Sequence, residues 1–554
     1  MTQGFRLRMA MATLVGTVRV GSGFLFVALC KQAVDTATGR AEGELAICVA
    51  ALIATLVIEL LCTSASNRIT EVAEADMQDA IRQRLFGRLL TATWAARQTH
   101  HTADLLTRLT DDSRMAAECL CRTIPTTITA LVQLVGAFLL LWHFSPSLAL
   151  LLLFLLPAFT LAGKVYFRKV RTLQCRLRHT ESRLSEHIQD SLQHRVLLLT
   201  YRHTVRTAEV LGALHRSRHH LVRRKTSLTD RSRTAVLAGF EAGYLAAFLW
   251  GITGLRNGTV SFGLMTAYLQ LAAQIQRPTA QLARLLPQLI QSHTAFSRLA
   301  DIDRLPVEPE PVGAEQTEDT QPVGIALRNI TFAYAEQEPP VFRHFSHTFP
   351  PGSHTAIMGI TGTGKSTLLR LLLALLQPQE GEMELYSTED GKRKATPISA
   401  ATRSQMVYVP QGNSLLSGTI RQNLLLGKPD ATEEEMWEAL HTAAADFVAD
   451  LRDGLDTRCG EHGHRLSEGQ AQRIAIARGL LRRGAVLLLD EISASLDEQT
   501  ETLLMSRLAE ARRSHTVLFV THRSSVLAYC DHTLRLASLE RTVLSMSKTR
   551  SFHE

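Results

Sequence analysis

The sequence predicts a multidomain membrane protein, in which an all-α six-helix transmembrane domain with long cytoplasmic helical extensions precedes an α/β domain with a phosphate-binding loop. Three observations favour this fold class. Six segments apolar enough to cross a bilayer lie within about the first 290 of the 554 residues. The connections between these segments are very unequal in length. After residue 322, strand-like and helix-like segments alternate, as they do in α/β domains.

The six spans follow from the thickness of a bilayer, whose hydrocarbon core is crossed by about 20 apolar residues of helix. Backbone groups inside lipid must pair within their own segment, so each span is expected to be a helix. The predicted spans are Met9–Cys30, Glu44–Ser64, Pro125–His143, Ser147–Tyr166, Ala235–Leu255 and Phe262–Ile275. The last span contains Gln270 and Gln274 and is expected to continue as a helix towards Ser297.

Two polar connections are long, at about 60 residues between spans two and three and about 68 between spans four and five. Both carry apolar residues at helical spacing, for example Ile81, Leu85 and Leu89. Two helices of ~25 residues each would project nearly ~40 Å from the membrane, at ~1.5 Å per residue. The other connections are short, which places the long and the short loops on opposite sides of the membrane.

The basic charge of the chain belongs to one of these long connections. The net charge is +8, and Lys164–Arg233 alone holds 17 Lys/Arg against 5 Asp/Glu, a difference of +12. Positive loops stay cytoplasmic during insertion, so this block indicates orientation and does not require nucleic acid as a partner. The histidines of this block lack metal-ligand spacing, and the eight scattered cysteines form neither a disulfide framework nor a zinc site.

Composition also predicts the domain boundaries. The transmembrane domain is expected at 1–302, with cytoplasmic coupling loops at about 65–124 and 167–234. A segment rich in Pro, Glu, Thr and Gly predicts a linker at 303–322, followed by the α/β domain at 323–545 and a tail at 546–554. Buried strands of the α/β domain are expected at Thr355–Met358, Met406–Val409, Ala485–Leu489 and Thr516–Val520.

A glycine-rich loop is the strongest local signal. It follows the expected strand at 354–358 and opens an expected helix, Ser366–Leu375. Its glycines let backbone N–H groups close around phosphates, Lys365 reaches the terminal phosphates, and Ser366 can ligate Mg²⁺. The loop consists of Gly359, Ile360, Thr361, Gly362, Thr363, Gly364, Lys365, Ser366 and Thr367. This strand–loop–helix context predicts a nucleotide site.

An apolar strand that ends in two carboxylates supplies the catalytic hypothesis. In Ala485–Glu491, Asp490 emerges where it can hold Mg²⁺ through water. Glu491 would stand beside the terminal phosphate as a base or as the residue that positions the attacking water. The alternative is that both carboxylates are merely solvated at a strand end and have no catalytic role, which is improbable behind a phosphate loop.

Between these motifs, Leu466-Ser-Glu-Gly-Gln470 runs into Ala-Gln-Arg-Ile-Ala-Ile-Ala-Arg478. Together with the phosphate loop, this segment resembles the signature of the ATP-binding cassette (ABC) family. Glu468 stands where the family more often has glycine. The hydroxyl of Ser467 at a helix N-terminus suits a phosphate, with Gly469 and Gln470 beside it.

Other family marks appear in the expected order. Tyr334 resembles the aromatic residue that stacks on adenine, and Gln411 resembles the glutamine that senses Mg²⁺ and the membrane domain. Asp497 ends Ser493-Ala-Ser-Leu-Asp497, which resembles the loop that crosses to the partner cassette, and His522 resembles the histidine that contacts the terminal phosphate. Glu461 resembles the acidic residue that faces the membrane domain just before the signature.

The resemblance implies an ATPase that uses ATP and Mg²⁺, the metal being held by Ser366, Gln411 and Asp490. In this family the signature completes the ATP site of the other subunit, so one cassette per chain implies a dimer. This chain has both halves of the machinery, which favours a homodimer. A heterodimer with a second half-transporter stays open.

The first 302 residues resemble the exporter-type membrane domain of the same family. The similarity rests on helix order and on local patterns in 104–112, 145–149 and 298–302. It places the tips of two coupling loops near Asp111–Met115 and Gln193–Arg202, on the cassettes. The implied function is export or flipping of a lipid, drug or peptide by alternating access.

Alternatives to export are an importer of metal chelates with the same architecture and an ATP-gated channel or regulator. A cassette ATPase that remodels DNA or ribosomes would lack the six spans. The expected location is a bacterial inner membrane, with the ATPase domain cytoplasmic. Arg19, Glu59 and Glu241 fall within spans, either in a polar substrate cavity or as structural pairs such as Arg19 with Glu241.

Overall fold

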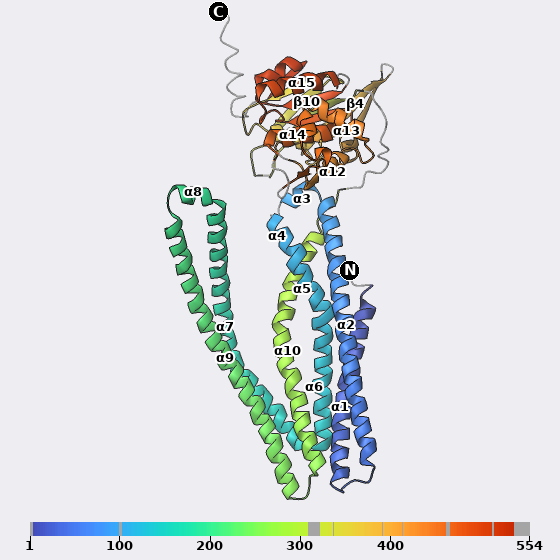
Figure 1. The fold of residues 1–554 in the computed structure, drawn as a ribbon, viewed down its shortest axis with the longest axis vertical. Helices are drawn as coiled ribbons and strands as arrows, with labels where there is room; N and C mark the ends of the chain where they lie inside the picture. The colour runs from blue at the N-terminus through green and yellow to red at the C-terminus, as the bar shows by residue number, and fades with distance from the viewer. Residues whose placement is uncertain are drawn as a thin grey trace, which may run out of the picture. The chain divides into compact units, whose positions relative to one another are not determined.

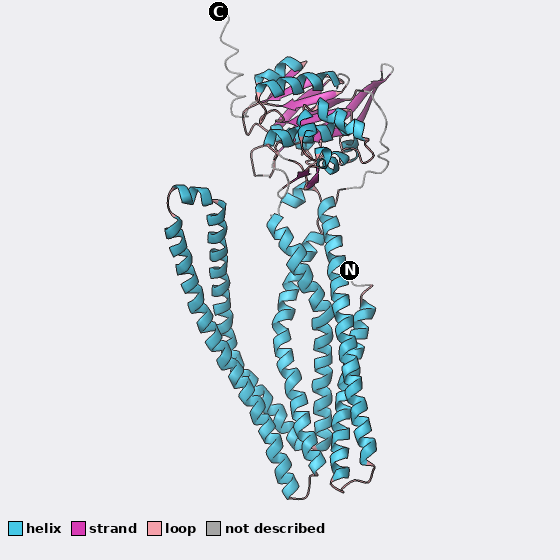
Figure 2. Cartoon of the chain, in the orientation of Figure 1, coloured by secondary structure: helices cyan, strands magenta, loops and turns pink. Residues whose placement is uncertain are grey.

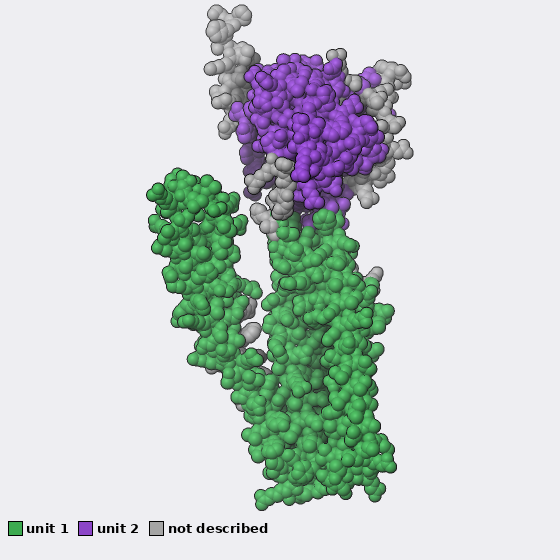
Figure 3. All heavy atoms as spheres, viewed as in Figure 1, with its two compact units in different colours: residues 1–87, 102–304 green, residues 88–101, 305–554 purple. Residues whose placement is uncertain are grey.

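The structure, a computed structural model, describes residues 4–98, 102–308, 322–335, 337–389, 392–412, 414–460, 466–482, 484–511 and 515–536. The chain divides into two compact units, one formed by residues 1–87 with 102–304 and the other by residues 88–101 with 305–554 (Figure 3). The described part of the first unit is helical, and the strands of the sheets lie in the second (Figure 2).

Six long helices of the described residues lie where the spans were predicted (Figure 1). They are α1 (Arg6–Ala37), α2 (Leu45–Thr91), α6 (Ile124–Phe144), α7 (Pro146–Gln193), α9 (Thr204–Arg256) and α10 (Phe262–Asp303). Among the described residues, four helical stretches are long and apolar enough to cross a membrane, namely α1, α2, 104–144 and α9. The number of six spans therefore stays a prediction.

The helices extend well beyond the predicted spans. α2, α7 and α9 are 47, 48 and 53 residues long, so helices fill most of the two long connections, as the periodicity predicted. α10 passes the predicted end at Ile275 and reaches Asp303, although Pro278 and Pro287 lie inside it. The expected continuation of the sixth span towards Ser297 is confirmed.

The tip of the second long connection lies where it was expected. α7 ends at Gln193, the short helix α8 (Arg195–Thr200) follows, and Arg202 turns the chain with a φ of 54° before α9. α8 exposes Val196, Leu197 and Leu199, at 78%, 54% and 52%. An exposed apolar tip of this kind is typical of a surface that contacts another protein.

The predicted tip of the first long connection, Asp111–Met115, is wrong. α2 continues to Thr91, and the chain turns there into the short helix α3 (Trp94–Gln98). Residues 111–115 lie in the returning helical stretch of α4 (Thr102–Thr107), α5 (Ser113–Glu118) and α6, with π-helical segments at 108–112 and 119–123. Local sequence pattern could not locate this turn, because the turn is fixed by backbone hydrogen bonds from residues 91–93 to residues 306–308.

Two sequence patterns of the first unit, 104–112 and 298–302, meet in space. Arg298 forms ion pairs with Asp104 at 2.6 Å and with the buried Asp112 at 3.3 Å. Arg108 pairs with Asp104 at 2.8 Å and donates to the carbonyl oxygen of Arg298 at 3.1 Å. The π-helical segment that contains Arg108 and Asp112 thereby holds the returning helical stretch against α10.

Small residues and one glycine bring the membrane helices together. Ala137, Ala149 and Ala247 are fully buried in the apolar core of this unit, which suits helix packing without large side chains. At Gly263 a Cβ atom would lie 2.2 Å from the carbonyl oxygen of Lys31, so only glycine fits this approach of α10 to α1. The Gly263 amide donates to the buried Asp35 carboxylate at 3.1 Å.

The expected structural pair of Arg19 and Glu241 does not form in this single chain, in which both residues are described. Arg19 is half-buried on α1, whereas Glu59 and Glu241 are exposed. These carboxylates are left for lipid headgroups, solvent or a second chain.

Among the described residues, the second unit contains three sheets. Their strands are β1 (Gly324–Phe332), β2 (Phe342–Phe349), β3 (His354–Met358), β4 (Glu380–Glu389), β5 (Lys392–Pro397), β6 (Met406–Val409), β7 (Gly418–Thr419), β8 (Arg458–Cys459), β9 (Val486–Asp490), β10 (Thr516–Val520) and β11 (His532–Arg535). An antiparallel sheet has the order β2-β1-β4-β5, and a parallel sheet has the order β11-β3-β10-β9-β6. The four predicted strands are confirmed within one residue at each end.

Helices α11 (Lys365–Leu372), α12 (Ile420–Leu425), α13 (Glu433–Thr442), α14 (Glu468–Leu481) and α15 (Glu498–Ala511) complete this unit. α11 is shorter than the predicted 366–375, because Ala374 has a φ of 50° and cannot continue the helix. Strands β9 and β10 are buried along their whole length, which is typical of a central parallel sheet. Residues 309–321 of the predicted linker and 537–554 lie outside the described residues.

The turn after α2 folds onto the second unit beside the chain that leaves α10. The Thr93 amide donates to the carbonyl oxygen of Pro306, and the Glu308 amide donates to that of Thr91, both at 2.9 Å. The guanidinium of Arg403 pairs with the Glu308 carboxylate and also donates to the Leu373 carbonyl oxygen at 2.6 Å. This two-stranded pairing joins the segment that follows α2 to the segment that follows α10, both within the second unit.

Candidate nucleotide-binding and catalytic site

The predicted site residues gather at one edge of the parallel sheet. Strands β3, β10, β9 and β6 are consecutive neighbours in this sheet, and all run in the same direction. The phosphate loop follows β3, His522 follows β10, Asp490 ends β9 and Gln411 follows β6. Ligands of open α/β sheets bind at the carboxyl ends of the strands, so the topology brings these predicted residues to one place.

The phosphate loop is held open by its own side chains. Gly362 and Gly364 have φ values of 89° and 91°, which only glycine adopts without strain. The Thr363 hydroxyl donates to the carbonyl oxygen of Ile360 at 2.9 Å. The buried Lys365 ammonium donates to the carbonyl oxygen of Gly359 at 2.7 Å, so its charge lies inside the loop. Gly364 caps α11, whose free N–H groups and dipole favour an anion there.

The remaining loop residues have different surroundings. Ser366 and Thr361 are exposed, as is Ile360 at 63%. Thr367 is buried, and its hydroxyl lies 3.0 Å from the Tyr334 hydroxyl. The structure therefore leaves the Ser366 hydroxyl accessible to a metal-bound phosphate, whereas Thr367 supports the fold of the site.

Tyr334 is placed beside the phosphate loop by three contacts. Its hydroxyl accepts a hydrogen bond from Arg370 Nη1 at 3.0 Å, and the neighbouring bond to Thr367 fixes the same atom. Its ring packs edge-on against Phe332, with 5.2 Å between ring centroids. The ring stays 44% exposed, so one face is available for stacking on a flat base.

Arg370 also reaches the turn after α2. Its guanidinium lies over the ring of Trp94, 5.7 Å from the ring centroid, and the Trp94 ring packs against the core of the second unit. One arginine on the phosphate-loop helix therefore contacts both the adenine-stacking candidate Tyr334 and the first residue of α3. The sequence analysis did not identify Arg370.

Asp490 is the buried acid of the site, at 6% exposure. Burial, and then the neighbouring charge of Glu491, raise the pKa of this carboxyl. The Tyr408 hydroxyl donates to it at 3.5 Å, which leaves most of its capacity as an acceptor unused. A buried carboxylate of this kind is stabilised by a cation, and hydroxyl, amide and carboxylate oxygens from Ser366, Gln411 and Asp490 are the hard ligands that Mg²⁺ prefers.

Glu491 is held in an uncommon backbone conformation at the end of β9. Its φ is 47°, and its amide donates to the carbonyl oxygen of Val520 at 2.9 Å. The Gln411 side chain donates to its carboxylate at 2.7 Å, and His522 Nδ1 lies 3.9 Å from its other oxygen. Strained backbone at a strand end commonly marks a functional site. Glu491, Gln411 and His522 thus form one cluster, and their catalytic roles stay a prediction.

The signature residues lie on a different element. Ser467 caps α14: its hydroxyl accepts from the Gln470 amide at 3.2 Å, and the Gln470 side chain accepts from the Ser467 amide at 2.9 Å. Glu468 is the first residue of the helix, where its charge suits the helix dipole. A Cβ atom on Gly469 would lie 2.9 Å from the carbonyl oxygen of Ser495.

Within the described chain, no hydrogen bond or ion pair joins Ser467, Gly469 or Gln470 to the phosphate loop. Asp497 likewise caps α15, by accepting from the amide and the hydroxyl of Thr500 at 2.9 and 2.7 Å. These bonds lower the pKa of Asp497. Gln470 and Asp497 thus support helix starts within their own chain. Glu461 lies outside the described residues.

The signature helix and the glutamine loop are also joined by a residue that sequence reasoning missed. The buried Gln472 donates to the carbonyl oxygen of Pro410, next to Gln411, at 3.1 Å. A glutamine on the buried face of a helix is the signal that could have drawn attention to it, because buried polar groups need partners.

Comparison with known proteins agrees with this geometry. The family described as "ABC transporter transmembrane region" matches residues 9–279, and that described as "ABC transporter" matches residues 342–494. A fatty acid ABC transporter ATP-binding/permease protein of Mycobacterium tuberculosis is 30% identical over 434 residues, or 78% of this chain and 67% of that protein. The ATP-dependent lipid A-core flippase of Escherichia coli (strain K12) is 26% identical over 537 residues, or 95% and 90%.

A third relative, the ABC multidrug transporter mdr2 of Aspergillus fumigatus, is 29% identical over 81% of this chain, which spans only 57% of that protein's length. The solved structure of a bacterial Atm1-family ABC exporter with ATP bound has the same fold, with a TM-score of 0.78 and 22% identity over 99% of this chain and 100% of that one. The chain therefore belongs to the ABC transporter family, with a membrane-spanning region and an ATP-binding cassette fused in one chain that couples ATP hydrolysis to transport.

Proposed function

We propose that this chain is one subunit of a dimeric exporter that uses ATP hydrolysis to export or flip an amphipathic lipid-like substrate by alternating access. The observation that carries the proposal is the division of the site. Lys365, Gln411, Asp490, Glu491 and His522 meet at one sheet edge, whereas the signature serine caps a separate helix and, within the described chain, forms no hydrogen bond to them. A second chain is needed to bring a signature to this edge.

At that edge, the residues fall into three roles. Lys365 and the amides at the start of α11 would bind the phosphates, and the exposed face of Tyr334 would stack on adenine. Glu491 would accept the proton of the attacking water, with Gln411 donating to one of its carboxylate oxygens and His522 3.9 Å from the other. Mg²⁺ held by Ser366, Gln411 and Asp490 would neutralise phosphate charge.

The membrane part supports a lipid-like substrate. The surfaces of α1, α2, α6 and α9 expose many large apolar side chains, such as Leu60 at 70% and Leu139 at 60%. Two of the relatives carry fatty acid and lipid A-core in their names. Both are amphipathic molecules that partition into a bilayer, which favours a substrate taken from the membrane.

The same proposal sets the boundaries and the orientation. The transmembrane domain would comprise 1–302, the linker 303–322 and the cassette 323–545, with the basic connection 167–234 and the cassette in the cytoplasm. A homodimer is favoured because one chain carries Lys365, Glu491 and a signature serine. The inner membrane of a bacterium is the proposed location.

The test is a flipping assay in proteoliposomes with a fluorescent lipid A or fatty-acyl phospholipid analogue. Mg²⁺ and ATP should move the probe to the leaflet opposite the cassette, and Glu491→Gln protein should leave it in place. Movement in the opposite direction would indicate an importer, and ATP-dependent ion leakage without probe movement would indicate a channel or regulator. Either of these outcomes would contradict export.

A further inference from the structure

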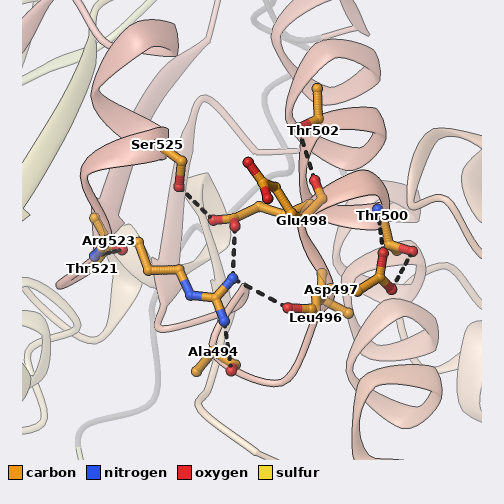
Figure 4. A network of polar contacts seen from close by, with 10 residues as sticks. Ala494, Leu496, Asp497, Glu498, Thr500, Thr502, Thr521, Arg523 and Ser525 are labelled. Atoms are coloured by element: carbon orange, nitrogen blue, oxygen red, sulfur yellow. Dashed lines mark hydrogen bonds and ion pairs between the residues drawn. The ribbon is translucent and has the colours of Figure 1, made fainter.

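Arg523, the residue that follows His522, reaches across to the loop after β9 (Figure 4). Its Nη2 donates to the carbonyl oxygen of Ala494 at 3.1 Å, and its Nη1 donates to that of Leu496 at 3.2 Å. The Nη1 atom also donates to the Glu501 carboxylate at 2.7 Å. A single guanidinium thus connects two loops and a helix.

The buried carboxylate of Glu501 anchors the Arg523 guanidinium. It lies on α15, and its side chain is only 5% exposed. One carboxylate oxygen accepts from Arg523 and the other accepts from the Ser525 hydroxyl at 3.0 Å. A buried charge is costly unless it is paired and hydrogen-bonded, so the pair is expected to stay formed. Because the guanidinium is a planar fork, it can hold two backbone carbonyls and a carboxylate at once, which an ammonium group cannot reproduce.

The two loops that Arg523 connects carry the two groups that face each other in the site. Glu491 opens the first loop, and its carbonyl oxygen accepts from the Ala494 amide at 3.2 Å. His522 directly precedes Arg523 and is 59% exposed. The Arg523 amide is itself fixed by the Thr521 hydroxyl at 3.0 Å. The backbone on both sides of the 3.9 Å approach of His522 to the Glu491 carboxylate is therefore tied to one guanidinium.

We propose that Arg523 and Glu501 are positioning residues for ATP hydrolysis, which set the spacing between Glu491 and His522 by tying the loop that follows each strand to α15. Neither residue contacts the reacting atoms. The inference rests on the proposed roles of Glu491 and His522. Displacement of a catalytic group by about 1 Å can cost ~10²-fold in rate, so loss of the tie is expected to lower kcat more than it changes ATP binding.

The helix that carries Glu501, α15, offers a matched control. Arg507 lies on this helix, and its Nη1 donates to the carbonyl oxygen of His441 and to the Asp446 carboxylate, both at 2.7 Å. It thus makes the same kinds of bond at a place that the catalytic cluster does not touch. Arg507→Ala removes an arginine, an ion pair and a carbonyl contact from α15, and is expected to leave kcat unchanged.

The experiment compares the parent chain, Arg523→Ala, Arg523→Lys and Arg507→Ala as full-length protein in nanodiscs. Amide hydrogen exchange is followed in peptides covering 493–497, together with kcat and KM for ATP. Arg523→Ala is expected to speed exchange there at least ~5-fold and to lower kcat by ~10-fold, with KM changed less than ~2-fold. Arg523→Lys should recover only part of both losses, because lysine can pair with Glu501 without holding both carbonyls.

The proposal is overturned if Arg523→Ala exchanges and hydrolyses like Arg507→Ala. Faster exchange with an unchanged kcat would also overturn it, because the loop would then be held without consequence for the reaction. Full recovery by lysine would contradict the role of the two carbonyl bonds. A parent chain that binds but does not hydrolyse ATP would count against the proposed function, and the exchange measurement would still decide whether Arg523 holds the loop.

Discussion

The cassette and the membrane unit use their polar side chains in different ways. In the cassette, buried polar groups such as Lys365, Asp490 and Glu501 gather around one sheet edge, and each has a defined partner. In the membrane unit, Arg19, Glu59 and Glu241 of the predicted spans take part in none of the ion pairs found among the described residues, and many large apolar side chains are exposed. From this difference we expect single substitutions in the cassette to change ATP hydrolysis strongly. Single polar substitutions in the membrane helices should change it little.

The largest effect expected from this comparison is at Glu491. Glu491→Gln should lower ATP hydrolysis by ~10²-fold or more, because an amide cannot take the proton of the attacking water. ATP binding should be retained, since the phosphates are held by other groups. The corresponding substitution Glu59→Gln, at an exposed glutamate within a predicted span, should change the rate of ATP hydrolysis less than ~2-fold. For both variants, steady-state ATPase rates measure hydrolysis, and a fluorescent ATP analogue measures binding.

Comparable hydrolysis by Glu491→Gln and the parent would remove Glu491 from its catalytic role. A large loss in Glu59→Gln would instead break the comparison, because a membrane carboxylate would then control the chemistry of the cassette.

Lys365 is expected to show the next largest effect. Lys365→Ala removes a buried ammonium that already lies inside the phosphate loop, and charge-assisted hydrogen bonds are worth ~1.5–3 kcal/mol. The Kd for ATP should therefore rise by about 10–100-fold. Lys31→Ala in the membrane unit, which loses a 3.6 Å ion pair with Asp35, should leave the Kd unchanged. An equal Kd for Lys365→Ala and the parent would contradict the assignment of the loop.

A smaller effect is expected at Arg370, which holds the Tyr334 hydroxyl. Arg370→Ala should raise the KM for ATP by ~3–10-fold, because Tyr334 loses a hydrogen bond of about 1 kcal/mol that fixes its ring. The matched control is Arg393, whose guanidinium lies 4.2 Å from the Tyr386 ring centroid on the β4–β5 edge. Arg393→Ala should not change the KM, and a similar rise in both variants would exclude a specific role for Arg370.

The same contrast explains what could be predicted from the sequence. Each predicted catalytic residue of the cassette follows a parallel strand and therefore lies at the same sheet edge. These residues could be picked out from the sequence because phosphate chemistry needs particular residue types at such strand ends. The tip of the first long connection was misplaced, because the pairing of Thr91 and Thr93 with Pro306 and Glu308 joins segments more than 200 residues apart. Lipid accepts any apolar side chain, so the pattern located the membrane helices without specifying their partners.

Arg370, Arg523 and Gln472 show a second limit on prediction. Each acts by reaching a backbone carbonyl, a tyrosine hydroxyl or a carboxylate on another element. No local spacing distinguishes such a residue from an exposed arginine or glutamine. Two weaker signals were available: Arg523 directly follows a candidate catalytic histidine, and Gln472 lies on the buried face of a helix.

The smallest expected effect concerns stability and pH. The raised pKa of Asp490 means that ionisation of this buried carboxyl opposes folding of the nucleotide-free chain. Asp490→Asn should therefore raise Tm at neutral pH by a few degrees, while abolishing the stabilisation by Mg²⁺ and ATP. Because the folded-state pKa lies above the unfolded value, the native state binds the proton more tightly and the parent gains stability as the pH falls. The Tm difference should therefore shrink at acidic pH.

The matched control is another buried aspartate, Asp35, in the membrane unit. It is paired with Lys31 and accepts from the Gly263 amide, so Asp35→Asn should lower Tm. A fall in Tm for Asp490→Asn at neutral pH, or a difference between parent and variant that grows at acidic pH, would contradict the account of Asp490.

The central claim is that two chains share each ATP site, and a mixed dimer tests it most directly. Lys365→Ala and Ser467→Arg homodimers should each carry two damaged sites. When the two variants are combined through different affinity tags, both lesions fall in one site and the other keeps an intact Lys365 and an intact Ser467. The purified mixed dimer should hydrolyse ATP faster than either parent variant, up to about half the native rate if the sites act independently. Hydrolysis no faster than in the two homodimers, in a mixed dimer that is assembled and binds ATP, would contradict completion of each site by the partner chain.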